Sequence, residues 1–250
     1  MRTRDTSATE RPSPRIAAVL ALEEPSLAAV AGYLADPDAG VRRIAVATLD
    51  EHLPDGYHSA LVDALSDADP GVRRETAEAV RELVEVLPDP GAFAVGLGAA
   101  DPVVRAVTVH LLSSRQVGTG VAYRAALTDP DHRVRIEAVR ALVSVDDDTG
   151  VAAATADENR EVRIAAVGGL ATLRTGAGAV RPVVADPAVA VPTLTRALSD
   201  RHLDVRKAAV LSLSRWADSE AAARHALTDA LADGDADVRA YARHALSRVG

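Results

Sequence analysis

The 250-residue sequence contains no cysteine and very few aromatic residues. Without cysteine, a disulfide framework, a thiolate metal site and a cysteine nucleophile are all excluded. Phe, Trp and Tyr together make up only 2% of the chain, so a core has to be built from Ala, Val and Leu. Small aliphatic residues of this kind suit thin layers of closely packed helices.

Long apolar runs and excess positive charge are also missing. No stretch of about 18 apolar residues occurs, so we expect no membrane span. With 28 basic and 36 acidic residues, the formal net charge is −8, which disfavours nucleic acid and anionic membranes as partners. The first 14 residues are polar and lack the apolar segment of a signal peptide. We therefore expect a disordered tail at 1–14 and a cytoplasmic location.

One sequence block recurs seven times along the chain. An acidic turn is followed by Val-Arg and then by apolar residues at helical spacing, as in DPDAGVRRIAVATL (36–49) and DPDHRVRIEAVRAL (129–142). The Arg of the block is found at Arg42, Arg73, Arg105, Arg135, Arg163, Arg206 and Arg239. The spacings between these positions are 31, 32, 30, 28, 43 and 33 residues, which indicates a chain built from structural repeats.

Each block predicts the start of one helix. Six of the seven residues three positions before the block Val are of N-capping types, for example Asp38, Asp131 and Asn159. Counted from that Val, position +4 is always small and position +8 is always Leu or Val, so both lie on one apolar stripe. A shorter amphipathic segment is predicted before each block, for example at 26–35, 57–66, 121–128, 191–199 and 220–232. Each repeat is thus predicted to contain helix A, an acidic turn and helix B.

A two-helix unit of about 30 residues cannot bury both of its faces alone, whereas stacked units can. The blocks D-P-D-x-x-V-R-x-x-A-x-x-x-L resemble HEAT repeats, specifically the short bacterial type shared with phycobilisome-lyase-type HEAT proteins. The resemblance covers residues 25–249. It implies an all-α fold, a right-handed α-α superhelical solenoid of about seven HEAT-like helical hairpins, which we expect to form one domain over 15–250. It also implies that the turn Asp and the block Arg form an inter-repeat hydrogen-bonding ladder. A basic stripe for phosphate is the alternative role of these arginines.

The repeat pattern is interrupted in the middle and modified at both ends. The long spacing between Arg163 and Arg206 contains a stretch rich in Gly, Ala and Pro, which predicts an irregular loop at 175–189. This loop is either a tolerated insertion or a segment that touches a partner. Residues 15–22 are predicted to form a capping helix. Arg243 replaces the apolar residue found at +5 in the other blocks, as expected for a polar terminal cap.

The resemblance implies that helix B lines the concave side, with an exposed face centred on position +6 and flanked by +2 and +10. We call this the helix-B face, and we expect it to bind another protein or a peptide. The expected contact residues are Arg43, Arg74, His110, Ile136, Arg140, Ile164, Lys207, Leu211 and His244. Apolar anchors would supply affinity, and charged side chains would set register and specificity. Alternatively, the two Ile residues pack against the 175–189 loop or an adjacent helix.

No catalytic constellation stands out in the sequence. The one local cluster of possible metal ligands is Asp50, Glu51, His52, Asp55 and His58, in a turn where such residues usually solvate and cap. The chain has no His-Glu dipeptide of the kind that holds iron in deoxyhypusine hydroxylase, and no P-loop or G-x-S-x-G motif. We predict a non-catalytic scaffold or adaptor without metal or cofactor. The alternatives are a lyase or lyase subunit of the bilin-lyase-like HEAT branch, and a HEAT-like DNA-binding protein or glycosylase.

Overall fold

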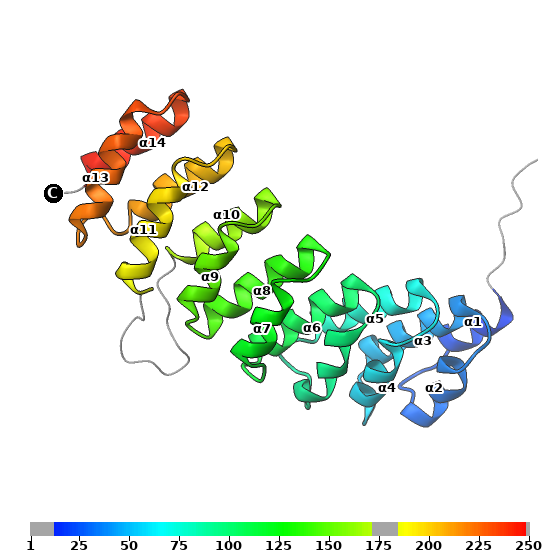
Figure 1. Cartoon of the computed structure of the whole chain (residues 1–250). Coiled ribbons are helices and arrows are strands. Elements are labelled where there is room, and N and C mark those ends of the chain that lie inside the picture. The colour runs from blue at the N-terminus through cyan, green and yellow to red at the C-terminus, as the bar shows by residue number, and fades with distance from the viewer. Residues whose placement is uncertain (1–12, 172–184, 249–250) are drawn as a thin grey trace, which may run out of the picture. The chain divides into compact units, whose positions relative to one another are not determined.

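The computed structural model describes residues 13–171 and 185–248, and all regular secondary structure in these two ranges is helical (Figure 1). The helices fall into two compact units, residues 1–104 and residues 105–250. No described helix has the length and apolar character needed to cross a membrane. The all-α repeat architecture predicted from the sequence is confirmed.

The first unit consists of short helices gathered around one long helix. Its elements are α1 (Pro14–Leu20), α2 (Leu27–Leu34), α3 (Ala39–His52), α4 (Tyr57–Ala64), α5 (Pro70–Glu82) and the 3-10 helix η1 (Pro90–Gly98). Helix α3 packs against α1, α2, α4 and α5, and α4 also packs against η1. Helix α6 (Pro102–Ser114) contains the boundary between the two units.

The second unit is a two-layer stack of hairpins. Its further elements are α7 (Gly120–Ala126), α8 (His132–Ser144), α9 (Asp148–Ala154), α10 (Arg160–Gly169), α11 (Pro187–Ala197), α12 (Leu203–Leu213), α13 (Ala221–Asp229), η2 (Ala230–Ala232) and α14 (Ala236–Ser247). Helices α8, α10, α12 and α14 pack side by side as one layer, and α9, α11 and α13 form the other (Figure 1). The first layer contains the helices B of successive repeats.

Each predicted helix B begins where its acidic turn ends. The Asp38 carboxylate accepts the N–H of Gly40 at 2.7 Å, and the Asn159 side chain accepts the N–H of Glu161 at 2.8 Å. These bonds satisfy donors that lack a partner within the first helical turn. His202, the one residue at this position outside the N-capping types, makes no such bond. Local side-chain chemistry therefore sets the start of most of these helices.

The core of each hairpin lies on the predicted apolar stripe. All seven residues at position +4 are buried, with at most 1% of their surface exposed: Ala45, Thr76, Thr108, Ala138, Ala166, Ala209 and Ala242. At position +8, the residues from Leu49 to Leu213 are at most 3% exposed, whereas Leu246 in the last helix is half-buried. Burying one such aliphatic side chain is worth about 1.5–3 kcal/mol. Small residues at +4 leave room for the neighbouring helix, as predicted.

Several predicted boundaries shift. Ser13 caps α1 and Pro14 begins it, so these two residues do not belong to the expected tail, and residues 1–12 lie outside the described part. Of the predicted loop at 175–189, residues 175–184 also lie outside the described part. Residues 187–189 are helical, because Asp186 caps α11 and Pro187 occupies its first position. The polar end is present as expected, with Arg243 exposed on α14.

Candidate functional site

The block arginines and turn aspartates form a ladder that joins successive hairpins. Arg163 donates two hydrogen bonds to the carboxylate of Asp200 in the next repeat, at 2.7 and 3.0 Å. Its third nitrogen donates to the carbonyl of Asp157 in its own turn, at 2.9 Å. Two-pronged pairs of the same form, which we call rungs, are Arg42–Asp67, Arg105–Asp129, Arg135–Asp157 and Arg206–Asp233.

The rungs are sheltered from solvent, and the arginines of two of them lower the pKa of their carboxylate partners. The side chains of Arg163 and Asp200 are only 5% and 13% exposed. Burial alone would raise the pKa of Asp200, but the bonds from Arg163 and from the N–H of His202 outweigh it and lower that pKa. The pKa of Asp67 is lowered chiefly by its bond from the Arg42 guanidinium. Because these arginines are engaged within the chain, the geometry argues against a phosphate-binding stripe.

One rung is irregular, and each end of the ladder differs from its interior. In the third repeat Ala99 stands where the other turns have Asp, and Arg73 pairs instead with Asp101 at 3.1 Å. At the start, Arg15 of α1 donates to the first turn carboxylate, Asp36. At the other end, Arg239 donates only to main-chain carbonyls, those of Asp233 and Gly234. The last hairpin therefore ends the ladder without an acidic partner within the described residues.

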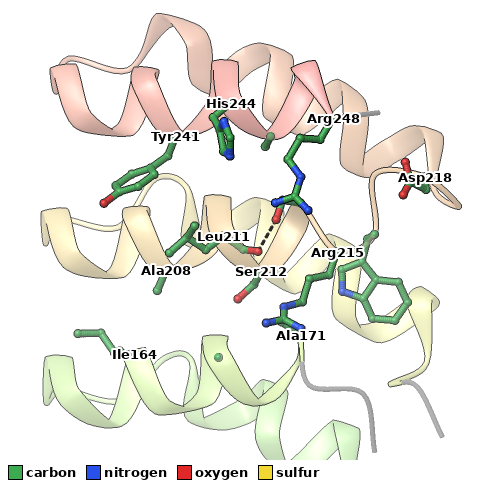
Figure 2. A pocket seen from close by; sticks show the side chains of 14 residues that line it. Ile164, Ala171, Ala208, Leu211, Ser212, Arg215, Asp218, Tyr241, His244 and Arg248 are labelled. Atoms are coloured by element: carbon green, nitrogen blue, oxygen red, sulfur yellow. Dashed lines mark hydrogen bonds between the residues drawn. The ribbon is translucent and has the colours of Figure 1, made fainter. Parts of the chain in front are cut away.

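Three predicted contact residues are brought together in the second unit. Ile164 of α10, Leu211 of α12 and His244 of α14 line one open groove of about 900 Å³, which we call the α10–α14 groove. Figure 2 shows their side chains on three successive helices, with Tyr241 beside them. Leu211 is 52% exposed and Tyr241 is 41% exposed, so this face presents apolar surface to solvent.

The α10–α14 groove has a rigid floor. Ser212 is buried and donates its hydroxyl to the carbonyl of Val167 at 3.0 Å, which ties α12 to α10 directly beneath the groove. Trp216 is only 5% exposed and closes the end where α12 stops. Its indole N–H has no hydrogen-bond acceptor among the described residues. The floor is thus packed, and the remaining volume is open to a ligand.

The charged groups of the α10–α14 groove are mostly donors. Arg215 and Arg248 are exposed and line it, as do His244 and one carboxylate, Asp218 (Figure 2). In the part of the chain that the structure describes, neither guanidinium has an ion pair. By contrast, Arg43, Arg140 and Lys207 on the helix-B face each lie against a carboxylate of the chain.

Most of the other predicted contact residues are engaged within the chain. Arg140 donates to the carboxylate of Glu137 at 2.6 Å, and the imidazole of His110 lies 3.5 Å from the same carboxylate. Lys207 donates to Asp237 at 2.7 Å. In the first unit, the Arg43 guanidinium lies 4.0 Å from Glu75.

These contacts make the basic residues poorer candidates for setting the register of a partner. The remaining two predicted contact residues also lie outside the groove. Ile136 is half-buried, and Arg74 of the first unit is exposed.

The sequence missed the groove's polar residues for an identifiable reason. Position +10 of the last two repeats carries Arg215 and Arg248, which the pattern placed only beside the exposed face. Tyr241 lies at +3, a position that is apolar or small in most repeats and was not considered exposed. Asp218 belongs to the turn after α12, where the repeat gives no guidance. The two basic residues in successive repeats were the signal that could have identified this end.

The acidic residues and histidines around His52 make separate contacts of their own. Among the described residues no three His, Asp or Glu side chains converge as metal ligands would. Asp50 faces Glu82 of α5 instead, and its pKa is raised by burial and by that neighbouring carboxylate. His52 lies 4.0 Å from Glu51.

Comparison with known proteins agrees with this geometry. A scan against protein families matches residues 148–247 to HEAT repeats. These residues are similar to HEAT repeats. They comprise the hairpins from α9 to α14 and contain all lining residues of the α10–α14 groove except Arg248, while the blocks of the preceding hairpins follow the same pattern. HEAT repeats typically mediate protein interactions.

Solved structures share the HEAT-like fold. An engineered protein matches with a TM-score of 0.57 and 20% identity, covering 88% of this chain and 67% of the other. YibA of Escherichia coli matches with a TM-score of 0.60 and 18% identity, covering 88% of this chain and 80% of YibA. At these identities the likeness shows the fold alone. A search of curated proteins found no sequence relative.

Proposed function

We propose that this chain is a non-catalytic protein-interaction scaffold, and that its helix-B face binds a segment of a partner protein in the α10–α14 groove. The observation that carries the proposal is the exposure of Leu211 and Tyr241 on neighbouring helices over a packed floor. A groove of about 900 Å³ lies at the upper end of the usual range for ligand sites, about 300–1,000 Å³. Apolar anchors in such a groove are the usual source of affinity at protein interfaces.

The HEAT hairpins supply the rigidity that such a site needs. Ile164, Leu211 and Tyr241 each lie on a different helix B, and these helices are fixed to one another by rungs and by the Ser212 bond. A partner would therefore meet a preformed surface and would lose little free energy to ordering it. We also propose that the helix-B face is concave and that a partner makes further contacts along it. These contacts would involve Arg43, Arg74, His110, Ile136, Arg140 and Lys207.

A selection from displayed peptides tests the proposal. The whole chain would be the bait for random peptides of about 12 residues, a length that spans a groove of this kind. Leu211→Asp places a charge among the groove's apolar side chains and should abolish enrichment of the selected peptides. Val121→Asp is the matched control, because Val121 is 81% exposed on α7 and does not line the groove.

Two results would contradict the proposal. In one, the wild type enriches no peptide beyond the Leu211→Asp variant. In the other, Leu211→Asp and Val121→Asp weaken binding equally. Circular dichroism of each variant shows whether its helices are intact, so that loss of binding is not confused with loss of fold.

A further inference from the structure

The charges around the α10–α14 groove are distributed unevenly. On the rest of the helix-B face, Arg43, Arg140 and Lys207 each lie against a carboxylate of the chain. Arg215 and Arg248 have no such partner among the described residues, although the chain carries an excess of acid. Arg74 of the first unit is likewise exposed and without an ion pair among the described residues, but Arg215 and Arg248 line one groove together.

The charged side chains of this groove are mainly cationic. The guanidinium groups of Arg215 and Arg248 donate hydrogen bonds and cannot accept them. Asp218 is the one carboxylate among the lining residues. A ligand that complements this wall must bring acceptors, and a carboxylate matches a guanidinium in both charge and geometry.

The apolar side chains restrict the ligand further. Ile164, Leu211 and Tyr241 offer aliphatic and aromatic surface rather than a row of stacking rings. Single-stranded nucleic acid is bound by several stacking aromatics along a basic groove, and only Tyr241 and the buried Trp216 are present here. The net charge of −8 also opposes a polyanion.

We propose that the α10–α14 groove binds an acidic peptide segment of a partner protein. One aliphatic or aromatic side chain of the segment packs on Leu211 and Tyr241, and its flanking carboxylates pair with Arg215 and Arg248. This inference rests on the proposed function and names the chemistry of the partner. The arginines choose the segment by charge, while the apolar floor supplies contact area.

The test compares charge forms of one peptide. A peptide enriched by the wild-type chain is synthesised with a fluorescent label, together with a version in which every Asp and Glu is replaced by Asn and Gln, and a version in which they are replaced by Lys. Fluorescence anisotropy gives the Kd for each at about 150 mM salt, where distant charges are screened. We expect enriched peptides to be acidic, and the amide version to bind about ten-fold more weakly or worse.

Charge reversal in the protein supplies the reciprocal test. The double variant Arg215→Glu/Arg248→Glu should lose the acidic peptide and gain affinity for the Lys version, a gain that a misfolded protein could not show. The matched control is Arg81→Glu/Arg243→Glu, which makes the same change in net charge at two exposed arginines that do not line the groove. Its Kd for the acidic peptide should stay within about three-fold of wild type, since exposed distant charges act weakly.

The outcomes separate this inference from the proposed function. If the enriched peptides are neutral or basic, or if the amide version binds as well as the acidic one while Leu211→Asp still abolishes binding, the groove binds peptides but the acidic preference is wrong. If a single-stranded oligonucleotide of about 12 nucleotides displaces the acidic peptide at lower concentration than the unlabelled peptide does, the inference is also wrong. Failure to enrich any peptide over Leu211→Asp refutes both.

Discussion

Removing the arginine of one rung should destabilise the second unit strongly. Arg163→Met keeps the length and apolar stem of the side chain but leaves the Asp200 carboxylate with only the N–H of His202, at 2.8 Å. It also removes the donor to two main-chain carbonyls. Because both side chains of the pair are nearly buried, the loss should be about 3–5 kcal/mol.

The single tryptophan makes this measurable. Trp216 is 5% exposed and belongs to the same unit, so its fluorescence should report unfolding around α12. With a urea slope of about 1–3 kcal/mol/M, the expected loss lowers the midpoint by at least about 1 M. Arg160→Met is the matched control on the same helix, since its guanidinium is half exposed and lies 3.9 Å from Asp204. Its effect should be below about 0.5 kcal/mol.

A second substitution separates the charge from the packing. In Arg163→Met/Asp200→Asn, the amide oxygen can still accept the N–H of His202, but no buried charge remains. The double variant should therefore be more stable than Arg163→Met alone. Equal urea midpoints for Arg163→Met and Arg160→Met would refute the view that the rung holds the hairpins together. If the urea midpoint of the double variant does not exceed that of Arg163→Met, the unpaired charge of Asp200 is not the cause of the lost stability.

Three further outcomes follow from the described contacts. The pKa of Asp200, like those of Asp67, Asp129 and Asp233, is lowered when folded, so its stabilisation is present above the unfolded value of 3.8 and is lost below it. The urea midpoint should fall as the pH drops from about 5 to about 2. Asp50→Asn should stabilise the chain at pH 7, because the raised pKa of Asp50 beside Glu82 marks an ionised form that folding disfavours, and thermal unfolding near pH 7 and pH 3 should show the gain only at the higher pH. Gly169→Ala places a Cβ 2.7 Å from Val143 and should lower the free energy of unfolding by about 1–3 kcal/mol, with partial recovery in Gly169→Ala/Val143→Ala. An unchanged urea midpoint for Gly169→Ala would show that the site relaxes freely.

The repeat block predicted the helices B well because its signals are local. An N-capping side chain, Val-Arg and the small residue at +4 act within about three turns, and Asp38 and Asn159 make the bonds that their chemistry implies. The helices A were harder to place. Residues 90–98 form a 3-10 helix whose Gly and Pro content hides any helical period, so the bounds of the helix A expected before the third block could not be given from the sequence.

The candidate site was predicted only in outline, because contacts between repeats decide which side chains remain available. Ile164, Leu211 and His244 were identified from their position on the exposed face, and they do line one groove. The pair Arg140–Glu137 has i,i+3 spacing on one helix and could have been predicted from the sequence, whereas Lys207–Asp237 joins two repeats and could not. Pairing across repeats needs the register between helices, which only the folded chain defines.

The ladder also bears on how the number of hairpins can change over time. Each rung pairs the arginine at the same block position with the aspartate at the same turn position of the next repeat. Within the second unit, one hairpin could therefore replace another without changing how the repeats are joined. If the hairpin between Arg135 and Asp200 were deleted as a whole, Arg135 would meet Asp200 in place of its present partner Asp157. Duplication or loss of one complete repeat in the gene therefore preserves the rungs between the remaining hairpins. An insertion of a few residues inside a helix B would instead break a rung. Changes in chain length that keep the protein folded are therefore expected to add or remove whole repeats.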